Sequence, residues 1–485
     1  MKIAIKGNEG NLEGKIPEYY IQTFSLLFFP DDNNFGKSAE SGNHINIFAD
    51  KNEKIDNFVE IALDICYNKQ TAAKSAKIHT DNLLGEIGKL FYSAAGEITG
   101  IYPPWGMHTG IRPAKTAGEI YRKNGFDEKK TVEILCGEYL MHEKKAALAL
   151  AAHKNGEAAK GEIGAKDFSL YISIPFCPTR CRYCSFVSFA TPRLLKMIPQ
   201  YAKKLIEEIK IVGEITRNMR LKTIYIGGGT PSALDAEHLE RILGAIKDNF
   251  CFSDLAEYTA ECGRPDTITA QKLELFKNFG INRVSVNPQT LNDETLKKIG
   301  RNHNAEDFFA AFEAAKKAGI DNINTDCIMG FADESGEIME KTVKTLACLK
   351  PENITVHSLC LKKSSDFKSD RIHIHDAPEL NETLEKIYGI LTSAEYFPYY
   401  MYRQKYAAGN LENTGFCKKG RECLYNIYMM DELMPIFSAG AGAMTKIVKD
   451  GKIERIANYK YPYEYVKNDF QINSEKNRYK IEMLK

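Results

Sequence analysis

The spacing of hydrophobic positions changes near residue 167, and this change divides the chain into predicted parts. From Leu170 onward, short β-branched runs alternate with longer stretches such as Ala236–Phe250, in which apolar residues recur at i, i+3, i+4 and i+7. Alternating strand and helix units of this length favour a parallel sheet or barrel. The predicted strands are Leu170–Ile174, Thr223–Ile226, Tyr258–Glu261, Arg283–Asn287, Asn322–Ile328 and Asn353–Leu359.

The first 160 residues predict a smaller α+β unit. Apolar and polar residues alternate in three stretches, which indicates a small sheet. These stretches are Lys2–Ile5, Gln22–Phe29 and Ile45–Phe48. Helical spacing predicts helices over Phe58–Tyr67, Leu83–Phe91, Ala117–Lys123, Asp127–Glu143 and Lys144–Lys154. The segment Asn155–Lys166, rich in Gly and Lys, is the predicted boundary of this unit.

After the barrel, residues 377–395 predict a helix, Pro398–Tyr402 a strand, and Gly440–Met444 a close-packed turn that returns to the barrel rim. The expected fold class is therefore α/β, with a partial (β/α) barrel as its centre. We predict three domains: an amino-terminal accessory α+β domain over 1–160, the barrel over 161–365, and a small carboxyl-terminal α+β domain over 366–485.

Composition adds limits to this picture. With 485 residues, 44% apolar and 27% charged, the chain resembles an ordinary globular protein, and its net charge of +1 gives no reason to expect nucleic acid or membrane binding. Twelve scattered cysteines favour a reducing compartment. The amino terminus lacks a secretory core, and apolar runs such as Phe24–Phe29 are too short to span a bilayer. We therefore expect a cytoplasmic protein without a membrane span.

The main chemical signal is a cysteine cluster directly after the first predicted barrel strand. Cys177, Cys181 and Cys184 are separated by three and then two residues, and they supply three of the four ligands of a cubane iron-sulfur cluster. The remaining iron could chelate the amine and carboxylate of S-adenosylmethionine. A structural zinc site would need a fourth Cys or His, and none follows within thirty residues of Cys184; a disulfide would suit a secreted chain better.

Polar groups follow the other predicted strands as well. Because active-site groups of such barrels gather at the carboxyl ends of the strands, we expect these groups at one rim. They are Gly227–Pro231 after strand two, Glu261 after strand three, Asn287 and Gln289 after strand four, Asp326 in strand five, and Cys360 after strand six. Glycines would let the backbone approach a ligand closely.

Together, these motifs resemble the radical S-adenosylmethionine (SAM) enzymes. The similarity covers residues 167 to 445 and is closest to the oxygen-independent coproporphyrinogen III oxidase group. It is carried by Tyr171, the three cysteines, Gly227–Pro231, Glu261 in Ala-Glu-Cys, Asn287–Gln289, Ile299–His303, Asp326 and Ser358–Cys360. The oxidases of the group carry a further Cys after the last ligand, whereas Ser185 and Phe186 stand here, as in the haem-chaperone and HemZ branches. The HemZ branch is resembled more specifically through Trp105-Gly, Gly110-Ile-Arg-Pro, Tyr402–Lys405 and Ala408–Asn413.

The resemblance also implies roles for individual residues. Cys177, Cys181 and Cys184 would hold a 4Fe–4S cluster, and Tyr171 and Tyr183 would contact the cofactor. Gly228, Gly229 and Thr230 would hold the methionine part of SAM, and Arg301 its carboxylate. Glu261, Gln289 and Asp326 would bind the ribose hydroxyls or the amine, Cys360 the adenine, and Met444 would line the same cofactor site. No catalytic side chain is assigned.

The implied activity is oxidative decarboxylation of two propionates of coproporphyrinogen III, giving protoporphyrinogen IX. Two alternatives are a haem-binding chaperone and a radical methyltransferase that opens haem anaerobically. The expected partners are a tetrapyrrole and an electron donor such as a flavodoxin or ferredoxin. Basic residues at Arg403, Lys405, Lys418, Lys419 and Arg421 form either a propionate-binding cluster or a solvated loop.

Two further features remain. One has two possible interpretations, and the other is given a structural role. The Trp105 loop, with three prolines, is either a packed connector or a loop that faces a ligand. His373 and His375 alternate on one predicted strand and are taken as structural, because no third metal ligand is near them in the sequence.

Overall fold

A computed structural model describes most of the chain. The described residues are 1–7, 16–29, 42–51, 57–186, 188–360, 377–405, 407–449 and 452–468, with the single positions 477, 479, 480 and 482. The chain forms two compact units. Unit 1 contains Met1–Ala151, Asp376–Asn381 and Arg403–Leu411, and unit 2 contains Ala152–His375, Glu382–Tyr402 and Glu412–Lys485. The three-domain division expected from the sequence stays a prediction, and His373 and His375 lie outside the described residues.

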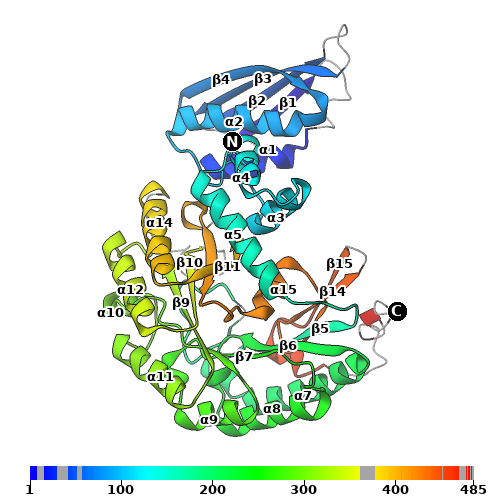
Figure 1. Ribbon diagram of the computed structural model, residues 1–485, viewed down its shortest axis with the longest axis vertical. Coiled ribbons are helices and arrows are strands. Elements are labelled where there is room, and N and C mark those ends of the chain that lie inside the picture. Colours follow the sequence, from blue (N-terminus) through cyan, green and yellow to red (C-terminus); the bar gives the residue numbers. More distant parts are fainter. Residues whose placement is uncertain are drawn as a thin grey trace. The chain divides into compact units, whose positions relative to one another are not determined.

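Unit 1 contains a four-stranded sheet whose strands follow the order β1-β2-β3-β4, with β1 and β2 parallel and the other neighbours antiparallel. Its elements are β1 (Lys2–Gly7), α1 (Glu18–Phe28), β2 (His44–Lys51), β3 (Phe58–Tyr67), β4 (Gln70–His79), α2 (Leu83–Thr99), α3 (Pro113–Lys123), α4 (Glu128–Tyr139) and the first half of α5 (Glu143–Ala159). Helices α1 and α2 cover one face of the sheet (Figure 1).

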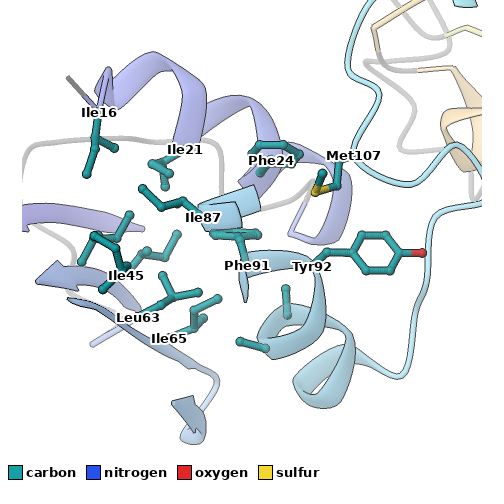
Figure 2. Packing of buried hydrophobic residues seen from close by; sticks show 14 of the residues in the cluster. Ile16, Ile21, Phe24, Ile45, Leu63, Ile65, Ile87, Phe91, Tyr92 and Met107 are labelled. Atoms are coloured by element: carbon teal, nitrogen blue, oxygen red, sulfur yellow. The ribbon is translucent and has the colours of Figure 1, made fainter. Parts of the chain in front are cut away.

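The core of unit 1 lies between these two helices and the sheet. Figure 2 shows Phe24 of α1 and Phe91 of α2 packed over Ile45, Leu63 and Ile65 of the strands, and all five side chains are buried. Burial of this apolar surface, at about 25 cal/mol per Å², stabilises the unit.

Two elements predicted in the first 160 residues have the other type of secondary structure. In addition, strand β4 was not predicted, and helix α5 continues through Ala159 into the predicted boundary segment Asn155–Lys166. The predicted helix over Phe58–Tyr67 is strand β3, because Val59, Ile61, Leu63 and Ile65 alternate with outward residues at the strand period of two. Conversely, the predicted strand over Gln22–Phe29 lies in helix α1, which buries Ile21, Phe24, Ser25 and Phe28 at helical spacing.

The Trp105 loop is a packed connector, which is one of the two interpretations that its sequence allows. The Trp105 ring is fully buried, and the Arg403 guanidinium lies 5.7 Å from its centre. Arg403 also donates to the carbonyl of His108 and, through its backbone N–H, to that of Ile111 at 2.8 Å. The loop and the stretch 403–411 therefore belong to the same unit, although about 300 residues separate them.

Unit 2 is built on an eleven-stranded sheet in the order β11-β12-β10-β9-β8-β7-β6-β5-β13-β14-β15. All six predicted barrel strands are present, and they run parallel from β5 to β10. Their bounds are β5 (Asp167–Ile174), β6 (Arg220–Gly228), β7 (Glu257–Glu261), β8 (Arg283–Ser285), β9 (Asn322–Met329) and β10 (Asn353–Ser358). The α/β fold with a central parallel sheet is thus confirmed.

Helices connect these strands along the outside of the sheet (Figure 1). They are α6 (Pro192–Leu195), α7 (Ile198–Thr216), α8 (Ala236–Asn249), α9 (Ala270–Asn278), α10 (Asp293–Lys298), α11 (Ala305–Lys317) and α12 (Gly336–Leu349). The remaining elements are α14 (Ala377–Ser393), β11 (Phe397–Arg403), β12 (Glu412–Cys417), α15 (Leu424–Asp431), β13 (Ile436–Ala439), β14 (Met444–Lys449), β15 (Lys452–Ala457) and α16 (Pro462–Tyr465). Among the described helices, none combines the length and apolarity needed to cross a bilayer.

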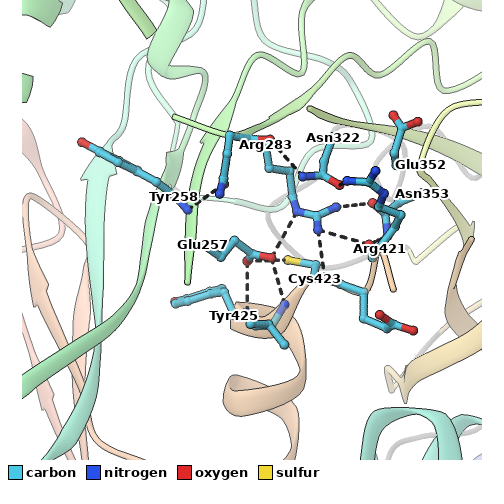
Figure 3. Close-up of polar contacts among 12 residues, drawn as sticks. Glu257, Tyr258, Arg283, Asn322, Glu352, Asn353, Arg421, Cys423 and Tyr425 are labelled. Carbon is cyan, nitrogen blue, oxygen red and sulfur yellow. Dashed lines mark hydrogen bonds and ion pairs between the residues drawn. The ribbon is translucent and has the colours of Figure 1, made fainter. Parts of the chain in front are cut away.

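A buried polar network joins the amino-terminal ends of the parallel strands to α15 (Figure 3). Glu257 accepts hydrogen bonds from Arg283 Nε at 3.2 Å, from Cys423 Sγ at 3.2 Å, and from the backbone N–H groups of Leu424 and Tyr425 at 3.0 and 3.2 Å. The last two are free donors of the first turn of α15, so the carboxylate holds the start of this helix. The network thereby fixes Tyr425 in the barrel interior.

Candidate radical site at the carboxyl ends of the strands

The cysteine loop after β5 packs against the glycine loop after β6. The backbone N–H of Gly229 donates to the carbonyl of Ile174 at 2.8 Å, and that of Thr230 donates to the carbonyl of Phe176 at 2.8 Å. These two bonds bring the side chain of Thr230 to 3.5 Å from the sulfur of Cys177. The thiol of Cys177 therefore faces the glycine loop.

Each of the three thiols has a side-chain hydrogen-bond partner. Cys177 pairs with Thr230 Oγ1 at 3.5 Å, and Cys181 accepts from Arg264 Nη1 at 3.7 Å. Cys184 pairs with Ser188 Oγ at 3.8 Å. Burial raises the pKa of Cys177 to about 11, so iron binding there must displace a proton.

The spacing of the thiols is not that of a single-ion site. In the described part of the chain, no three His, Cys, Asp or Glu side chains converge on one point where a lone metal ion could bind. A cubane requires a different arrangement, because its three cysteine thiolates bind three different irons.

The glycines of the second loop are required by protein packing. A Cβ at Gly229 would lie 2.6 Å from the carbonyl oxygen of Phe176, and Gly228 has a φ of +113°. A Cβ at Gly227 would approach the carboxylate of Glu261 to 3.0 Å. Only glycine permits this contact between the two loops. Binding of the methionine part of SAM by Gly228, Gly229 and Thr230 stays a prediction.

Arg301 and Gln289 are the clearest sign of an additional polar ligand at this rim. Arg301 donates to the carbonyls of Asn287 at 2.9 Å and Gly263 at 2.5 Å, whereas its Nε–H has no partner among the described residues. The side-chain oxygen of Gln289 is likewise buried without a partner there, and Gln289 has a φ of +68°. Buried polar groups are normally satisfied, so this donor and this acceptor fit the carboxylate and the hydroxyl or amine groups of SAM.

Two carboxylates occupy the same interior. Glu261 accepts from Tyr225 at 2.6 Å, and burial raises the pKa of Glu261 to about 7. Asp326 accepts from Asn287 at 2.8 Å and from Asn324 at 2.7 Å, and His357 Nε2 lies 3.8 Å from its carboxylate. Burial alone would raise the pKa of Asp326, but these neighbours lower it below its usual value. Asp326 is therefore ionised near neutral pH.

Tyrosines line the barrel beside these acids. The rings of Tyr171, Tyr225 and Tyr425 stack, with the centres of Tyr225 and Tyr425 4.5 Å apart and Tyr171 6.2 Å from Tyr225. Tyr183 packs against Phe331 with ring centres 5.9 Å apart. Such rings offer a flat apolar surface with polar edges.

The remaining predicted cofactor contacts are Cys360 and Met444. Cys360 follows β10, and Met444 begins β14 and is 47% exposed. Their roles toward SAM stay predictions.

Three residues near the site received no role in the sequence analysis: Arg264, His303 and His357. Arg264 follows the end of β7, so the expectation that active-site groups lie at the carboxyl ends of the strands could have identified it. Both ring nitrogens of His303 are buried without a hydrogen-bond partner among the described residues. Burial and the guanidiniums of Arg301 and Arg264 lower the pKa of His303 to about 3, so its ring is neutral. No sequence pattern marks His357.

Four of the five basic residues that were predicted to form either a propionate-binding cluster or a solvated loop have partners in the described structure. Within unit 1, Arg403 donates to the carbonyl of His108, and Lys405 donates to Tyr19 Oη at 3.1 Å. Within unit 2, Lys418 contacts Glu352, and Arg421 donates to Asn322 at 3.4 Å. These last contacts lie near the amino-terminal ends of β9 and β10, away from the cysteine rim. These basic residues are close in sequence but do not form one cluster, because the strands between them carry the chain to opposite ends of the sheet.

Comparison with known proteins agrees with this site. The Radical SAM superfamily model matches residues 171–346. The chain is 34% identical over 397 residues to the oxygen-independent coproporphyrinogen-III oxidase-like protein HemZ of Bacillus subtilis, covering 79% of this chain and 78% of the relative. It is 31% identical over 306 residues to the haem chaperone HemW of the same organism, covering 61% and 77%.

A solved structure supports the same fold. The coproporphyrinogen III oxidase HemN of Escherichia coli, described as a radical SAM enzyme, superimposes with a TM-score of 0.52 at 22% identity, covering 66% of this chain and 72% of that one.

The barrel and its cysteine motif define a radical SAM protein. Within this class, the chain belongs to the family of oxygen-independent coproporphyrinogen-III oxidase-like proteins that includes HemZ. The predicted cofactors, a 4Fe–4S cluster and SAM, are confirmed by this membership.

Proposed function

We propose that this protein uses SAM-derived radical chemistry to oxidise coproporphyrinogen III to protoporphyrinogen IX. Radical chemistry is supported mainly by the contact between the three-cysteine loop and the glycine loop. The Nε–H of Arg301 and the side-chain oxygen of Gln289, at the same rim, have no partner among the described residues. When bound and reduced, the cluster and SAM supply a 5'-deoxyadenosyl radical. The tetrapyrrole substrate is inferred from the names of the relatives HemZ and HemN.

The same change would occur at each of the two propionates. One hydrogen atom would pass from the propionate β-carbon to the 5'-deoxyadenosyl radical, the carboxylate would depart as carbon dioxide, and one electron would pass to an acceptor, leaving a vinyl group. Each turnover would require an external one-electron donor, such as a flavodoxin or ferredoxin. Protein residues bind and orient the reactants and exclude water and oxygen from the radical.

In this proposal the chain's own residues have distinct tasks. Arg301 binds the carboxylate of SAM through its unpartnered N–H, and Gln289 accepts from a hydroxyl or amine. Glu261 and Asp326 accept further hydrogen bonds from the ribose or the amine. The stacked tyrosines Tyr225 and Tyr425 offer a surface for the flat edge of a pyrrole ring.

One observation favours a second candidate, a haem-binding chaperone. Besides Arg264 and Arg301, which lie at the cysteine rim, the described barrel interior presents Glu261, Asp326 and tyrosines. Lys418 and Arg421 lie near the opposite ends of the strands. A tetracarboxylate needs several cations, so this interior suits a substrate with fewer carboxylates. The similarity to HemW points in the same direction.

An anaerobic assay tests the proposal. Reconstituted protein, reductant, SAM and coproporphyrinogen III should yield two carbon dioxide molecules per protoporphyrinogen IX, with stoichiometric 5'-deoxyadenosine. The matched control is Cys181→Ser, which removes one cluster ligand and should abolish both products.

Two other results would decide against the oxidase. Formation of 5'-deoxyadenosine without carbon dioxide would show radical chemistry on another substrate. Stoichiometric haem binding without turnover, measured by Soret absorption, would instead establish the chaperone.

A further inference from the structure

The hydrogen-bond partners of the three thiols differ in charge. Cys177 and Cys184 each pair with a hydroxyl group, of Thr230 and Ser188. Cys181 instead accepts from the guanidinium of Arg264, which is a permanent cation. Charged groups also lie near the other two thiols, because Arg264 interacts with Cys177 and Arg180 with Cys184. Cys181 differs from them in accepting a direct hydrogen bond from a cation.

Arg264 is held rigidly in this position. Only 3% of its side chain is exposed. Its Nε and Nη2 donate to the two carboxylate oxygens of Asp266 at 3.2 and 3.3 Å. The other N–H groups donate to the backbone carbonyl of Thr179 at 3.1 Å, to Thr179 Oγ1 at 2.8 Å, and to Cys181 Sγ at 3.7 Å.

These five hydrogen bonds use all five N–H donors of a guanidinium. Three of them reach the cysteine loop itself, at Thr179 and Cys181. Asp266 fixes the plane of the group from the other side. The geometry of the N–H that points to sulfur is thus determined by four other bonds.

We infer that Arg264 is a positioning residue that raises the reduction potential of the cluster through its bond to the Cys181 sulfur. Reduction adds one negative charge to the cluster and its thiolates. A buried cationic donor stabilises this reduced state more than the oxidised one, and hydrogen bonds to the sulfurs are a known determinant of cluster potentials. The inference rests on the cluster, not on the tetrapyrrole substrate.

A lysine cannot replace this arrangement. Its ammonium has three donors on a flexible stem, so it retains the charge but cannot bond Asp266, Thr179 and Cys181 in one plane. Glutamine removes the charge as well. Comparing the two variants therefore separates the contribution of the positive charge from that of the oriented hydrogen bond.

The experiment is an EPR-monitored redox titration of the reconstituted full-length protein without substrate. Arg264→Gln should lower the equilibrium constant for one-electron reduction about tenfold, which is a shift of about 59 mV to more negative potential. Arg264→Lys should give an intermediate shift. Iron and sulfide are counted in each sample to show that the cluster is fully loaded.

Arg182→Gln is the matched control. Arg182 lies in the same loop and donates to the carbonyl of Lys298 at 3.5 Å. Its removal takes away one positive charge near the cluster without removing a bond to a thiol. The shift for this variant should be less than a third of that for Arg264→Gln.

The inference is overturned if fully loaded Arg264→Gln has the wild-type potential, or if Arg182→Gln shifts the potential equally, since net charge alone would then be responsible. It is also overturned if both Arg264 variants lose the cluster while the apoproteins melt like wild type, since Arg264 would then serve assembly. Because no tetrapyrrole is present, none of these results bears on the proposed oxidase activity.

Discussion

Replacing Glu257 by Gln should destabilise unit 2 severely, although the two side chains have the same shape. Glu257 and Arg283 are each about 4 to 5% exposed, so their ion pair is shielded from water. The amide keeps one acceptor oxygen and puts an NH₂ group in place of the other. At least one of the four donors that now reach the carboxylate therefore loses its acceptor.

The expected magnitude follows from the burial of the pair. Removing one partner of a buried ion pair costs about 3–5 kcal/mol, because the remaining charge stays uncompensated. An unsatisfied backbone N–H at the start of α15 adds about 1–3 kcal/mol. Glu382, which pairs with Lys386 on exposed α14, gives the matched control, since Glu382→Gln should change stability by at most about 1 kcal/mol.

Urea denaturation followed by far-UV circular dichroism measures the effect. With a slope of about 1–3 kcal/mol per M, the unit 2 transition of Glu257→Gln should move down by about 1 M or more. Trp105 is the only tryptophan and lies in unit 1, so its fluorescence follows that unit separately. A double-mutant cycle with Arg283→Met should show that the two changes together cost less than their sum.

The reasoning would be refuted if Glu257→Gln and Glu382→Gln shifted the transition equally. Strict additivity in the cycle would also refute it, because the uncompensated Arg283 charge is the assumed cause.

Three further predictions concern the rim. Arg301→Lys should weaken SAM binding at least about tenfold in equilibrium dialysis, because lysine cannot keep both bonds to the Asn287 and Gly263 carbonyls and also present an N–H in the place of Arg301 Nε. Unchanged affinity would remove Arg301 from the SAM site. Because the pKa of Glu261 is raised to about 7, the folded chain keeps a proton that the unfolded chain releases near pH 4.5, and the stability that Glu261 contributes should fall between about pH 4.5 and 7. Melting experiments across this range should show no such fall for Glu261→Gln. A fall that persists in this variant would exclude Glu261 as its source. Gly229→Ala should cost about 1–3 kcal/mol and lower the iron content after reconstitution, since its Cβ would meet the Phe176 carbonyl at 2.6 Å; full iron content would contradict the role given to this contact.

Much of the fold and part of the site can be predicted from the sequence for a physical reason. Strands β5 to β10 are buried β-branched runs bounded by helical stretches, and this local pattern is readable without knowledge of their neighbours. The cysteine spacing and the glycine run are also local. Because parallel strands end at one rim, strand-end residues such as Glu261 and Asp326 can be placed together from the order of the strands alone.

Tertiary structure decided what depends on partners distant in the chain. The donor to Cys181 is Arg264, 83 positions away, and Arg283 reaches the carbonyl of Glu422, 139 positions away. Strand direction placed Lys418 near the amino-terminal ends of β9 and β10, which its position in the sequence does not reveal. The strand at Phe58–Tyr67 is not such a case, because the alternation of Val59, Ile61, Leu63 and Ile65 is readable from the sequence and the helix predicted there was a misreading. Spacing along the chain thus determined which ligands the protein offers, whereas charge, burial and hydrogen bonding at those ligands arise only when remote segments pack together.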